Sequence, residues 1–92
     1  MCCKRCMIQL SGRVQGVGFR YYAQKLGNTL ALFGYVRNLP DGSLVIEAEG
    51  NHLNMDLFIE RIKRGPQLAH VEQIQIQVSE CQHDLPNFEV QF

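Results

Sequence analysis

The sequence predicts an α+β fold, a split β-α-β sandwich in which two helices cover one face of an antiparallel sheet of four to five strands. Two observations predict it. Apolar and polar residues alternate in several short runs, as in half-buried strands, and apolar residues recur every three or four positions in two longer segments, as in helices. These segments follow one another as strand, helix, strand, strand, helix, strand and a short closing strand, an order that suits this sandwich.

The composition predicts one small domain over residues 1–92, because a chain of 92 residues without repeats or linkers fills a single two-layer core. Nine basic residues balance nine acidic ones, so the charge gives no reason to expect nucleic acid or an acidic membrane surface as a partner. No apolar run is long enough to span a bilayer, and the N-terminus is polar where a signal peptide has its apolar core. We therefore expect a cytoplasmic protein.

The first strand is expected at residues 7–11 and the first helix at residues 19–30. Two residues near the end of this helix are locally unfavourable. Gly27 lies in its interior at a cost of about 0.5–1 kcal/mol relative to alanine, and Ala31 stands where a glycine commonly reverses the chain. A helix that ends at Gly27 and is followed by a longer loop is the alternative.

The middle of the chain predicts a hairpin followed by the second helix. Residues 33–39 and 43–49 are the two strands, and the Pro-Asp-Gly sequence at residues 40–42 is a turn of the kind that joins antiparallel strands. Asn51 is expected to cap the second helix, and Gly65 is expected to end it. The apolar stripe of this helix consists of Met55, Phe58, Ile59 and Ile62.

The clearest alternating run spans residues 70–79 and predicts a strand with glutamines on its outer face. Its inward residues are Ile74, Ile76 and Val78. Val71 is out of phase with them, so a bulge or bend is expected near Glu72. A final short strand is predicted from Phe88, Val90 and Phe92.

The loop between the first strand and the first helix, residues 12–18, has the features of an anion site. Gly18, at the expected N-cap of the helix, offers no side chain to the free N–H groups of the first turn. Arg20 lies in that turn, where a cation is unfavourable by up to about 1 kcal/mol because the helix dipole is positive there. A bound anion makes this effect favourable. The sequence therefore predicts a phosphate-binding site formed by Arg20 and the backbone amides of this loop, here called the phosphate cradle. A tight turn beside a surface arginine is the alternative.

Two better-known phosphate loops do not fit. A P-loop ends in Gly-Lys-Ser/Thr, but Phe19 and Arg20 follow Gly18, so no site for a nucleotide and magnesium is expected. A dinucleotide-binding loop needs its third glycine where Tyr21 stands. The acidic residue at about the right distance for that loop, Asp41, lies in the predicted turn.

The four cysteines are Cys2, Cys3, Cys6 and Cys81. Reduced thiols are expected rather than disulfides, because no secretion signal is present. A zinc site would have to combine Cys3, Cys6, Cys81 and His83. This site is disfavoured because Cys6 is in phase with the apolar residues of the first strand and is expected in the core. Cys2 and Cys3 are expected in a frayed tail.

Two segments together resemble the motifs of the acylphosphatase family: Gly-Arg-Val-Gln-Gly-Val-Gly-Phe-Arg at residues 12–20 and Gly-Tyr-Val-Arg-Asn at residues 34–38. Gly42 and Gly50 fit the same pattern, and the resemblance covers nearly the whole chain. It implies a small cytosolic monomer with the ferredoxin-like split β-α-β fold. It also implies hydrolysis of the carboxyl–phosphate bond of acyl phosphates without metal or cofactor, with inorganic phosphate as product and inhibitor.

The resemblance also implies roles for single residues. Arg20 matches the family's phosphate-binding arginine, and Asn38 matches the asparagine that positions the attacking water. The amides of the phosphate-binding loop belong to Arg13, Val14, Gln15, Gly16, Val17, Gly18 and Phe19. The chain departs from the family at Leu44, where valine is usual, and at Ala31, where a helix-ending glycine is usual; neither departure touches the catalytic pair.

Two other functions compete with this one. RNA-recognition domains share the element order but read bases with aromatic residues on their central strands, whereas residues 43–49 are acidic and have no aromatic residue. The second competitor is a regulatory domain of the same fold that senses a phosphorylated or carbamoylated metabolite without consuming it. Binding without turnover would support that sensor. The physiological substrate is open.

Overall fold

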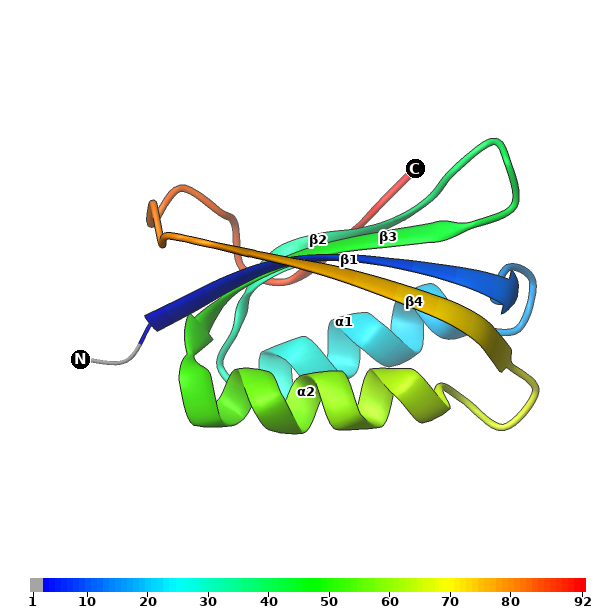
Figure 1. Ribbon diagram of the computed structural model, residues 1–92, viewed down its shortest axis with the longest axis horizontal. Helices are drawn as coiled ribbons and strands as arrows, with labels where there is room; N and C mark the ends of the chain where they lie inside the picture. Colours follow the sequence, from blue (N-terminus) through cyan, green and yellow to red (C-terminus); the bar gives the residue numbers. More distant parts are fainter. Residues whose placement is uncertain (1–2) are drawn as a thin grey trace.

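The computed structural model describes residues 3–92 and shows five strands and two helices in the predicted order. In chain order they are β1 (Cys3–Arg13), α1 (Phe19–Thr29), β2 (Phe33–Asn38), β3 (Leu44–Asn51), α2 (His52–Arg64), β4 (His70–Ser79) and β5 (Glu89–Gln91). The strands form one sheet in the order β4-β1-β3-β2-β5, and both helices lie on one face of it (Figure 1). The predicted α+β sandwich is confirmed. Neither helix in this part of the chain is long and apolar enough to cross a membrane.

One detail of the predicted sheet is wrong, because the sheet is mixed rather than antiparallel. β1 pairs with β3 and β4, and β2 pairs with β3, in antiparallel fashion. β5 runs parallel to β2, with Val90 opposite Val36. The reason lies in the connection after β4, which crosses from one edge of the sheet to the other before the chain enters β5 (Figure 1).

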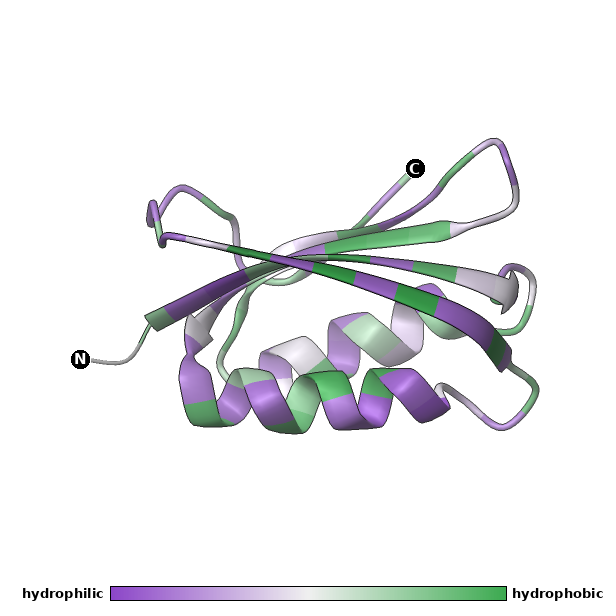
Figure 2. Ribbon diagram, in the orientation of Figure 1, coloured by the Kyte–Doolittle hydropathy of each residue, from purple (hydrophilic) through white to green (hydrophobic). Residues whose placement is uncertain are grey.

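The core lies between the sheet and the two helices. Alternate residues of the strands point toward the helices, and hydropathy alternates along both kinds of element (Figure 2). The buried side chains of α2 are Met55, Phe58 and Ile62, with Ile59 packed beside them, so the predicted stripe is confirmed. Cys6 is fully buried in this core and keeps a free thiol, as its phase in β1 predicts.

Two ends were predicted for α1, one near Leu30 and one at Gly27. The helix passes through Gly27 and ends at Thr29, so the shorter alternative is wrong. Gly27 is buried, and a Cβ at this position would lie 2.4 Å from the ring of Phe88. Only glycine lets the two segments approach this closely. Ala31 has a φ of 57°, the left-handed conformation that glycine usually takes after a helix.

The predicted turn and caps are present. In the turn after β2, the Oδ1 of Asp41 accepts a hydrogen bond of 2.9 Å from the N–H of Ser43. Asn51 caps α2, because its Oδ1 accepts a hydrogen bond of 2.9 Å from the N–H of Leu53. Gly65 follows the last residue of α2 with a left-handed φ of 69°. These local signals alone fix where the hairpin and the second helix begin and end.

The bulge predicted in β4 is also present. Ser11 and Gly12 of β1 pair with Gln73 and Val71, which leaves Glu72 without a partner in β1. The extra residue shifts the phase of β4 by one position, and this shift explains why Val71 does not match the residues that follow.

The burial expected for β4 is wrong in its second half. Ile76 lies opposite the buried Ile8 and so is on the core face, as predicted. However, Ile76 is 37% exposed and Val78 is 63% exposed. β4 lies at the edge of the sheet, where a side chain has a neighbouring strand on one side only. The alternating pattern therefore predicts the face of a residue but not the depth of its burial.

The cysteines differ from the prediction. Cys3 and Cys81 form a disulfide across 78 positions of the sequence, so the expectation of reduced thiols is wrong for this pair. Cys3 is also not frayed, because it is the first residue of β1 and pairs with Asn51. The expectation was based on the compartment, which says nothing about the distance between two sulfurs. Cys2 lies outside the described residues.

An ion cluster around the buried Arg5, on the sheet face opposite the helices, was not predicted. Arg5 is 8% exposed, and its guanidinium lies 2.8 Å from Glu47, 3.2 Å from Glu49 and 2.7 Å from Asp84. Glu47 and Glu49 are residues of β3, whereas Asp84 lies in the segment between β4 and β5. The cluster therefore fastens the crossing segment, residues 80–88, onto the sheet.

Candidate active site

The loop between β1 and α1 is fixed at its start by the core and shaped by two glycines. Val14 is buried, whereas Gly16 and Gly18 are exposed. The φ angles of these glycines are 74° and 80°, in the left-handed region that side chains other than glycine rarely adopt. The backbone of the loop can therefore approach a ligand without a Cβ in the way.

The side chain of Gln15 ties this loop to the β2–β3 hairpin. Its Nε2 donates hydrogen bonds to the carbonyl oxygens of Leu39 at 2.8 Å and Ser43 at 2.9 Å. Leu39 directly follows Asn38, the last residue of β2. The sequence pattern indicated Gln15 only for its backbone amide, because the bond from its side chain depends on how the hairpin lies beside the loop.

Among residues 3–92, no side chain caps the start of α1, as predicted. Gly18 is the N-cap, and the first turn contains no acidic residue. The hydrogen bond from the N–H of Tyr22 to the carbonyl of Gly18 is 3.1 Å long. The N–H groups of the preceding residues point out of the helix start and have no acceptor within it. The positive end of the helix dipole is therefore available to an anion.

Arg20 and Asn38 line one hollow of about 90 Å³. Arg20 belongs to the first turn of α1, and Asn38 ends β2. The hollow is completed by Val14, Gly16, Gly18, Phe19 and Tyr21. Most of the predicted site residues thus meet at one place, together with Tyr21, which the sequence pattern did not indicate. Three predicted residues do not line the hollow, namely Arg13, Gln15 and Val17.

The side-chain oxygen of Asn38 is buried and accepts no hydrogen bond from residues 3–92. A buried acceptor without a donor costs about 1–3 kcal/mol, and most such groups in folded proteins are paired. The oxygen of Asn38 therefore needs a donor from outside this part of the chain. Water is a donor of the right size for a hollow of this kind.

Phe92 lies against the predicted phosphate-binding arginine. The guanidinium carbon of Arg20 is 4.8 Å from the centroid of the Phe92 ring. A cation–π contact of this kind is worth about 0.5–1 kcal/mol at an exposed site. Stacking uses the face of the guanidinium plane, so the N–H groups at its edge stay available for an anion. The sequence pattern indicated Phe92 only as a residue of the last strand.

The charge of this hollow suits an anion. Its lining contains a guanidinium but no carboxylate and no histidine. A larger hollow of about 300 Å³ lies on the open face of the sheet and is lined by polar side chains such as Gln9, Ser43 and Gln75. The charged residue of that lining is Asp41, so the larger hollow offers an anion no positive partner. The hollow at Arg20 is therefore the candidate active site.

Fold and hollow together define a class of protein, the small α+β sandwiches in which a glycine-rich strand-to-helix loop and an arginine line one hollow. A sequence model of the acylphosphatase family matches residues 6–90, and the chain belongs to this family. The match covers all of the hollow's residues and both helices.

Relatives of known activity support this assignment. The chain is 42% identical over 85 residues to an acylphosphatase of Archaeoglobus fulgidus, with 92% of this chain and 94% of that protein covered. It is 46% identical over 76 residues to an acylphosphatase of Thermus thermophilus, with 83% of this chain and 86% of that protein covered. This homology shows an enzyme with acylphosphatase activity.

Solved structures show the same fold. The crystal structure of an acylphosphatase from Bacillus subtilis matches with a TM-score of 0.93 at 34% identity and covers 97% of this chain and 99% of that chain. Part of a full-length HypF, solved in a phosphate- and nucleotide-bound form, matches with a TM-score of 0.88 at 32% identity. That match covers 98% of this chain but 12% of HypF. The predicted ferredoxin-like acylphosphatase fold is confirmed.

Proposed function

We propose that the enzyme holds the phosphoryl group of an acyl phosphate on Arg20 and the amides of residues 15–19, while Asn38 orients a water molecule for in-line attack on phosphorus. The amides predicted at Arg13 and Val14 are left out, because Arg13 pairs with His70 in the sheet and the Val14 N–H donates to the carbonyl of Gly12. The products are a carboxylate and inorganic phosphate. One observation carries this proposal. Asn38, whose buried oxygen has no donor among residues 3–92, lines the same hollow as Arg20 and the uncapped start of α1.

The reaction needs positioning and charge stabilisation more than acid–base catalysis. A carboxylate is a good leaving group, so the bond between phosphorus and the acyl oxygen breaks without prior protonation of that oxygen. The negative charge on the remaining phosphoryl oxygens is stabilised by a guanidinium and by amides that the fold already holds in place. This demand agrees with a lining that contains one guanidinium and no carboxylate or histidine.

The role of Asn38 follows from the chemistry of an amide. Its oxygen accepts a hydrogen bond from water, and its NH₂ group donates to a developing negative charge. An amide is not a base near neutral pH, so it orients the water but does not remove a proton from it. The proton that water loses passes to a phosphoryl oxygen of the substrate, and the leaving carboxylate departs unprotonated.

The proposal has three further parts. Arg20 and the helix dipole supply the positive charge of the reaction, so turnover needs no metal or cofactor. Inorganic phosphate, as the product, competes with the substrate for the same cradle. The enzyme acts as a monomer in the cytoplasm, where Cys3 and Cys81 would be largely reduced.

The test is hydrolysis of benzoyl phosphate by the purified protein with a metal chelator present and inorganic phosphate titrated as an inhibitor. We expect turnover that the chelator does not reduce and that phosphate inhibits competitively. Turnover that the chelator abolishes would contradict the metal-independent mechanism. Noncompetitive inhibition by phosphate would place the phosphate outside the site of the reaction.

A sensor of phosphorylated metabolites is the second candidate. The observation in its favour is the similarity to part of HypF, whose structure is described as phosphate- and nucleotide-bound. The same assay separates the two candidates. If the protein binds inorganic phosphate but does not hydrolyse benzoyl phosphate, the phosphate-binding site is supported and the function is that of a sensor.

A further inference from the structure

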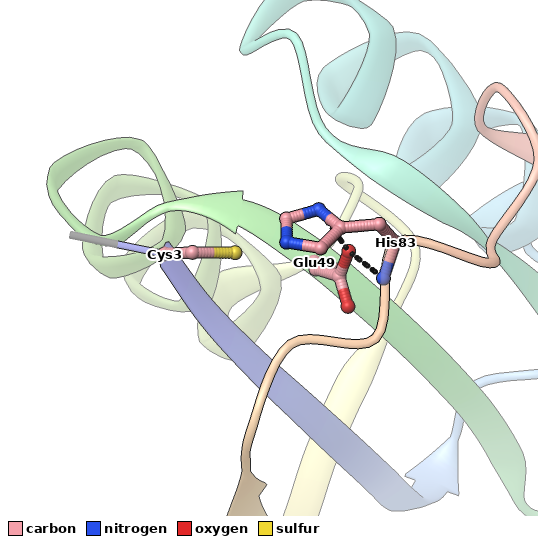
Figure 3. Close-up of side chains that lie close together, drawn as sticks. All are labelled: Cys3, Glu49 and His83. Atoms are coloured by element: carbon pink, nitrogen blue, oxygen red, sulfur yellow. Dashed lines mark hydrogen bonds and ion pairs between the residues drawn. The ribbon is translucent and has the colours of Figure 1, made fainter. Parts of the chain in front are cut away.

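Three side chains from distant parts of the sequence converge near the start of β1. They are Cys3, Glu49 of β3 and His83 of the segment that follows β4 (Figure 3). One sulfur, one carboxylate oxygen and one imidazole nitrogen from these residues all lie within 4.8 Å of one another. Cys81 brings a second sulfur, since it is bonded to Cys3. Thiolates, imidazoles and carboxylates are the ligands that zinc takes in proteins.

The position of His83 is not explained by the disulfide. Glu49 is 2% exposed and accepts hydrogen bonds from the backbone N–H groups of Gln82 at 2.8 Å and His83 at 2.9 Å. The same carboxylate lies 3.5 Å from the Nδ1 of His83. His83 itself has a left-handed φ of 58°. Backbone and carboxylate together hold the imidazole beside Cys3, and no residue in the described range 3–92 forms a hydrogen bond with its Nε2.

We propose that Cys3, Cys81 and His83 bind a zinc ion once the disulfide is reduced, with Glu49 as the carboxylate that orients His83. Histidine ligands commonly donate their second ring N–H to a carboxylate, which fixes the ring and raises its basicity. In this chain the carboxylate of Glu49 lies 3.5 Å from the Nδ1 of His83, close enough to take this role. Solvent completes the tetrahedron, because Cys3 and His83 are both exposed. The site is new for this chain and does not depend on the proposed catalytic mechanism.

The geometry of the pair of cysteines permits this change. The two Cα atoms are 6.3 Å apart. Two thiolates on one tetrahedral zinc ion lie about 3.8 Å apart, given zinc–sulfur distances of about 2.3 Å. Rotation of the two side chains about their Cα–Cβ bonds can open the sulfurs by this amount, so β1 and the segment after β4 need not separate.

The surrounding charge also favours a cation. Arg5 contacts Glu49, but the carboxylates of Glu47, Glu49 and Asp84 outnumber this one guanidinium. The cluster beside the proposed site is therefore net negative. A zinc ion adds positive charge where the chain has a surplus of carboxylates.

The change from disulfide to zinc site balances as two steps. A phosphine reductant gives two electrons and takes the oxygen of one water molecule, and the S–S bond of Cys3 and Cys81 becomes two thiols with the two hydrogens of that water. Zinc then displaces the two thiol protons, which pass to the buffer, and binds the two thiolates and the imidazole. In a cell, a dithiol protein takes the place of the phosphine.

The proposed zinc site and the hollow at Arg20 lie at opposite ends of β1. Cys3 is the first residue of this strand, and the loop that carries the hollow leaves its last residue, Arg13 (Figure 1). The zinc ion would therefore join the start of β1 to the segment after β4, as the disulfide does in the oxidised protein. Its role is to keep this connection under reducing conditions.

The experiment compares the oxidised and phosphine-reduced full chain by titration with Zn²⁺ in competition with a chromophoric chelator. Co²⁺ is titrated in parallel as a spectroscopic probe. We expect one zinc ion per reduced chain, a thiolate-to-cobalt charge-transfer band in the near ultraviolet, and no binding by the oxidised chain. Equal zinc binding by both forms, or no binding by the reduced form, would overturn the proposal.

Four variants identify the ligands. Cys81→Ser and His83→Ala should each weaken zinc binding about tenfold or more, and Cys81→Ser should also weaken the charge-transfer band. His70→Ala and Cys2→Ser are the matched controls and should bind as the wild type does. Unchanged affinity in His83→Ala, or lost affinity in Cys2→Ser, would show that the assignment of ligands is wrong.

Discussion

Arg20 and Asn38 reach the same hollow from two consecutive elements, the start of α1 and the end of β2, and each brings one kind of chemistry. Arg20 brings a permanent positive charge with donors in a planar fork. Asn38 brings an acceptor that the described residues leave without a donor. The division of work between a group that binds phosphate and a group that orients water can be tested residue by residue.

Arg20→Ala should weaken both phosphate inhibition and turnover, because it removes the cation of the cradle. Loss of one preorganised donor typically costs about 10²–10³-fold in rate, and we expect a loss of this size in kcat/KM. The measurements are kcat/KM for benzoyl phosphate and the inhibition constant of inorganic phosphate.

Arg37→Ala is the matched control for this variant. Arg37 is exposed on β2, and its guanidinium lies 5.9 Å from the centroid of the Tyr35 ring. It precedes Asn38 directly but is absent from the lining of the hollow. Both constants should stay near those of the wild type in this control. A phosphate inhibition constant that Arg20→Ala leaves unchanged would argue against the cradle.

At the scale of elements, the end of α1 involves two residues, Gly27 and Ala31, that are both locally unfavourable in the sequence. In the structure, the packing compensates the cost of one of them but not that of the other. Ala31 is exposed and takes the left-handed conformation, which costs an alanine about 1–2 kcal/mol. Gly27 is buried under the ring of Phe88 and leaves no room for a methyl group. The local cost of Gly27 is thus offset by the packing it allows.

Ala31→Gly should therefore raise the free energy of unfolding by about 1 kcal/mol, since glycine adopts this φ without strain. Gly27→Ala should lower it by about 1 kcal/mol or more, because forcing a methyl group into a packed site typically costs about 1–3 kcal/mol. Chemical denaturation of both variants measures these changes. A Gly27→Ala variant more stable than the wild type would show that Phe88 moves aside freely.

Local signals were sufficient to predict the elements themselves. The cap at Asn51, the turn at Asp41 and the bulge at Glu72 each depend on a few neighbouring residues, and all three are present. The loop before the first helix was predicted for the same reason, since an uncapped helix start beside an arginine is visible within nine residues of sequence. Its predicted start at residue 12 is wrong, because the first strand, predicted at residues 7–11, extends from Cys3 to Arg13.

At the scale of the whole molecule, the features that the sequence did not predict all depend on contacts between distant segments. The parallel pairing of β5, the Cys3–Cys81 disulfide and the cluster around Arg5 each involve the segment of residues 80–88 or the strand that follows it. This segment has no periodicity of its own. Its path is set by partners on β1, β2 and β3, which become neighbours only when the sheet forms.

The cluster around Arg5 makes the stability of the fold depend on pH. A hydrogen bond from Arg5 lowers the pKa of the Asp84 carboxyl. Burial raises the pKa of Glu49, but hydrogen bonds from the Gln82 N–H, from Arg5 and from the His83 N–H outweigh burial and leave this pKa below its ordinary value. Both carboxyls thus bind protons less tightly in the folded chain than in the unfolded chain.

Their contribution to stability is therefore complete above the unfolded-state values, about 3.9 for Asp and 4.3 for Glu, and is lost as the pH falls through the lower folded-state values. Asp84→Asn should be less stable than the wild type at pH 7, and the difference should shrink as the pH falls below about 4. Urea denaturation at several pH values measures this. A difference that stays constant with pH would show that Arg5 does not stabilise the charged form of Asp84.

The most direct test of the proposed mechanism is the kinetics of Asn38→Ala, with the turnover of benzoyl phosphate and the inhibition constant of inorganic phosphate measured on the same preparation. Asn87→Ala, an exposed asparagine outside the hollow, is the control. We expect turnover to fall by about 10²-fold or more while the phosphate inhibition constant stays within about twofold of the wild type, because the cradle is intact and the water is not oriented. Turnover near the wild-type rate, or a parallel loss of phosphate affinity, would contradict the role of Asn38 as the residue that positions water.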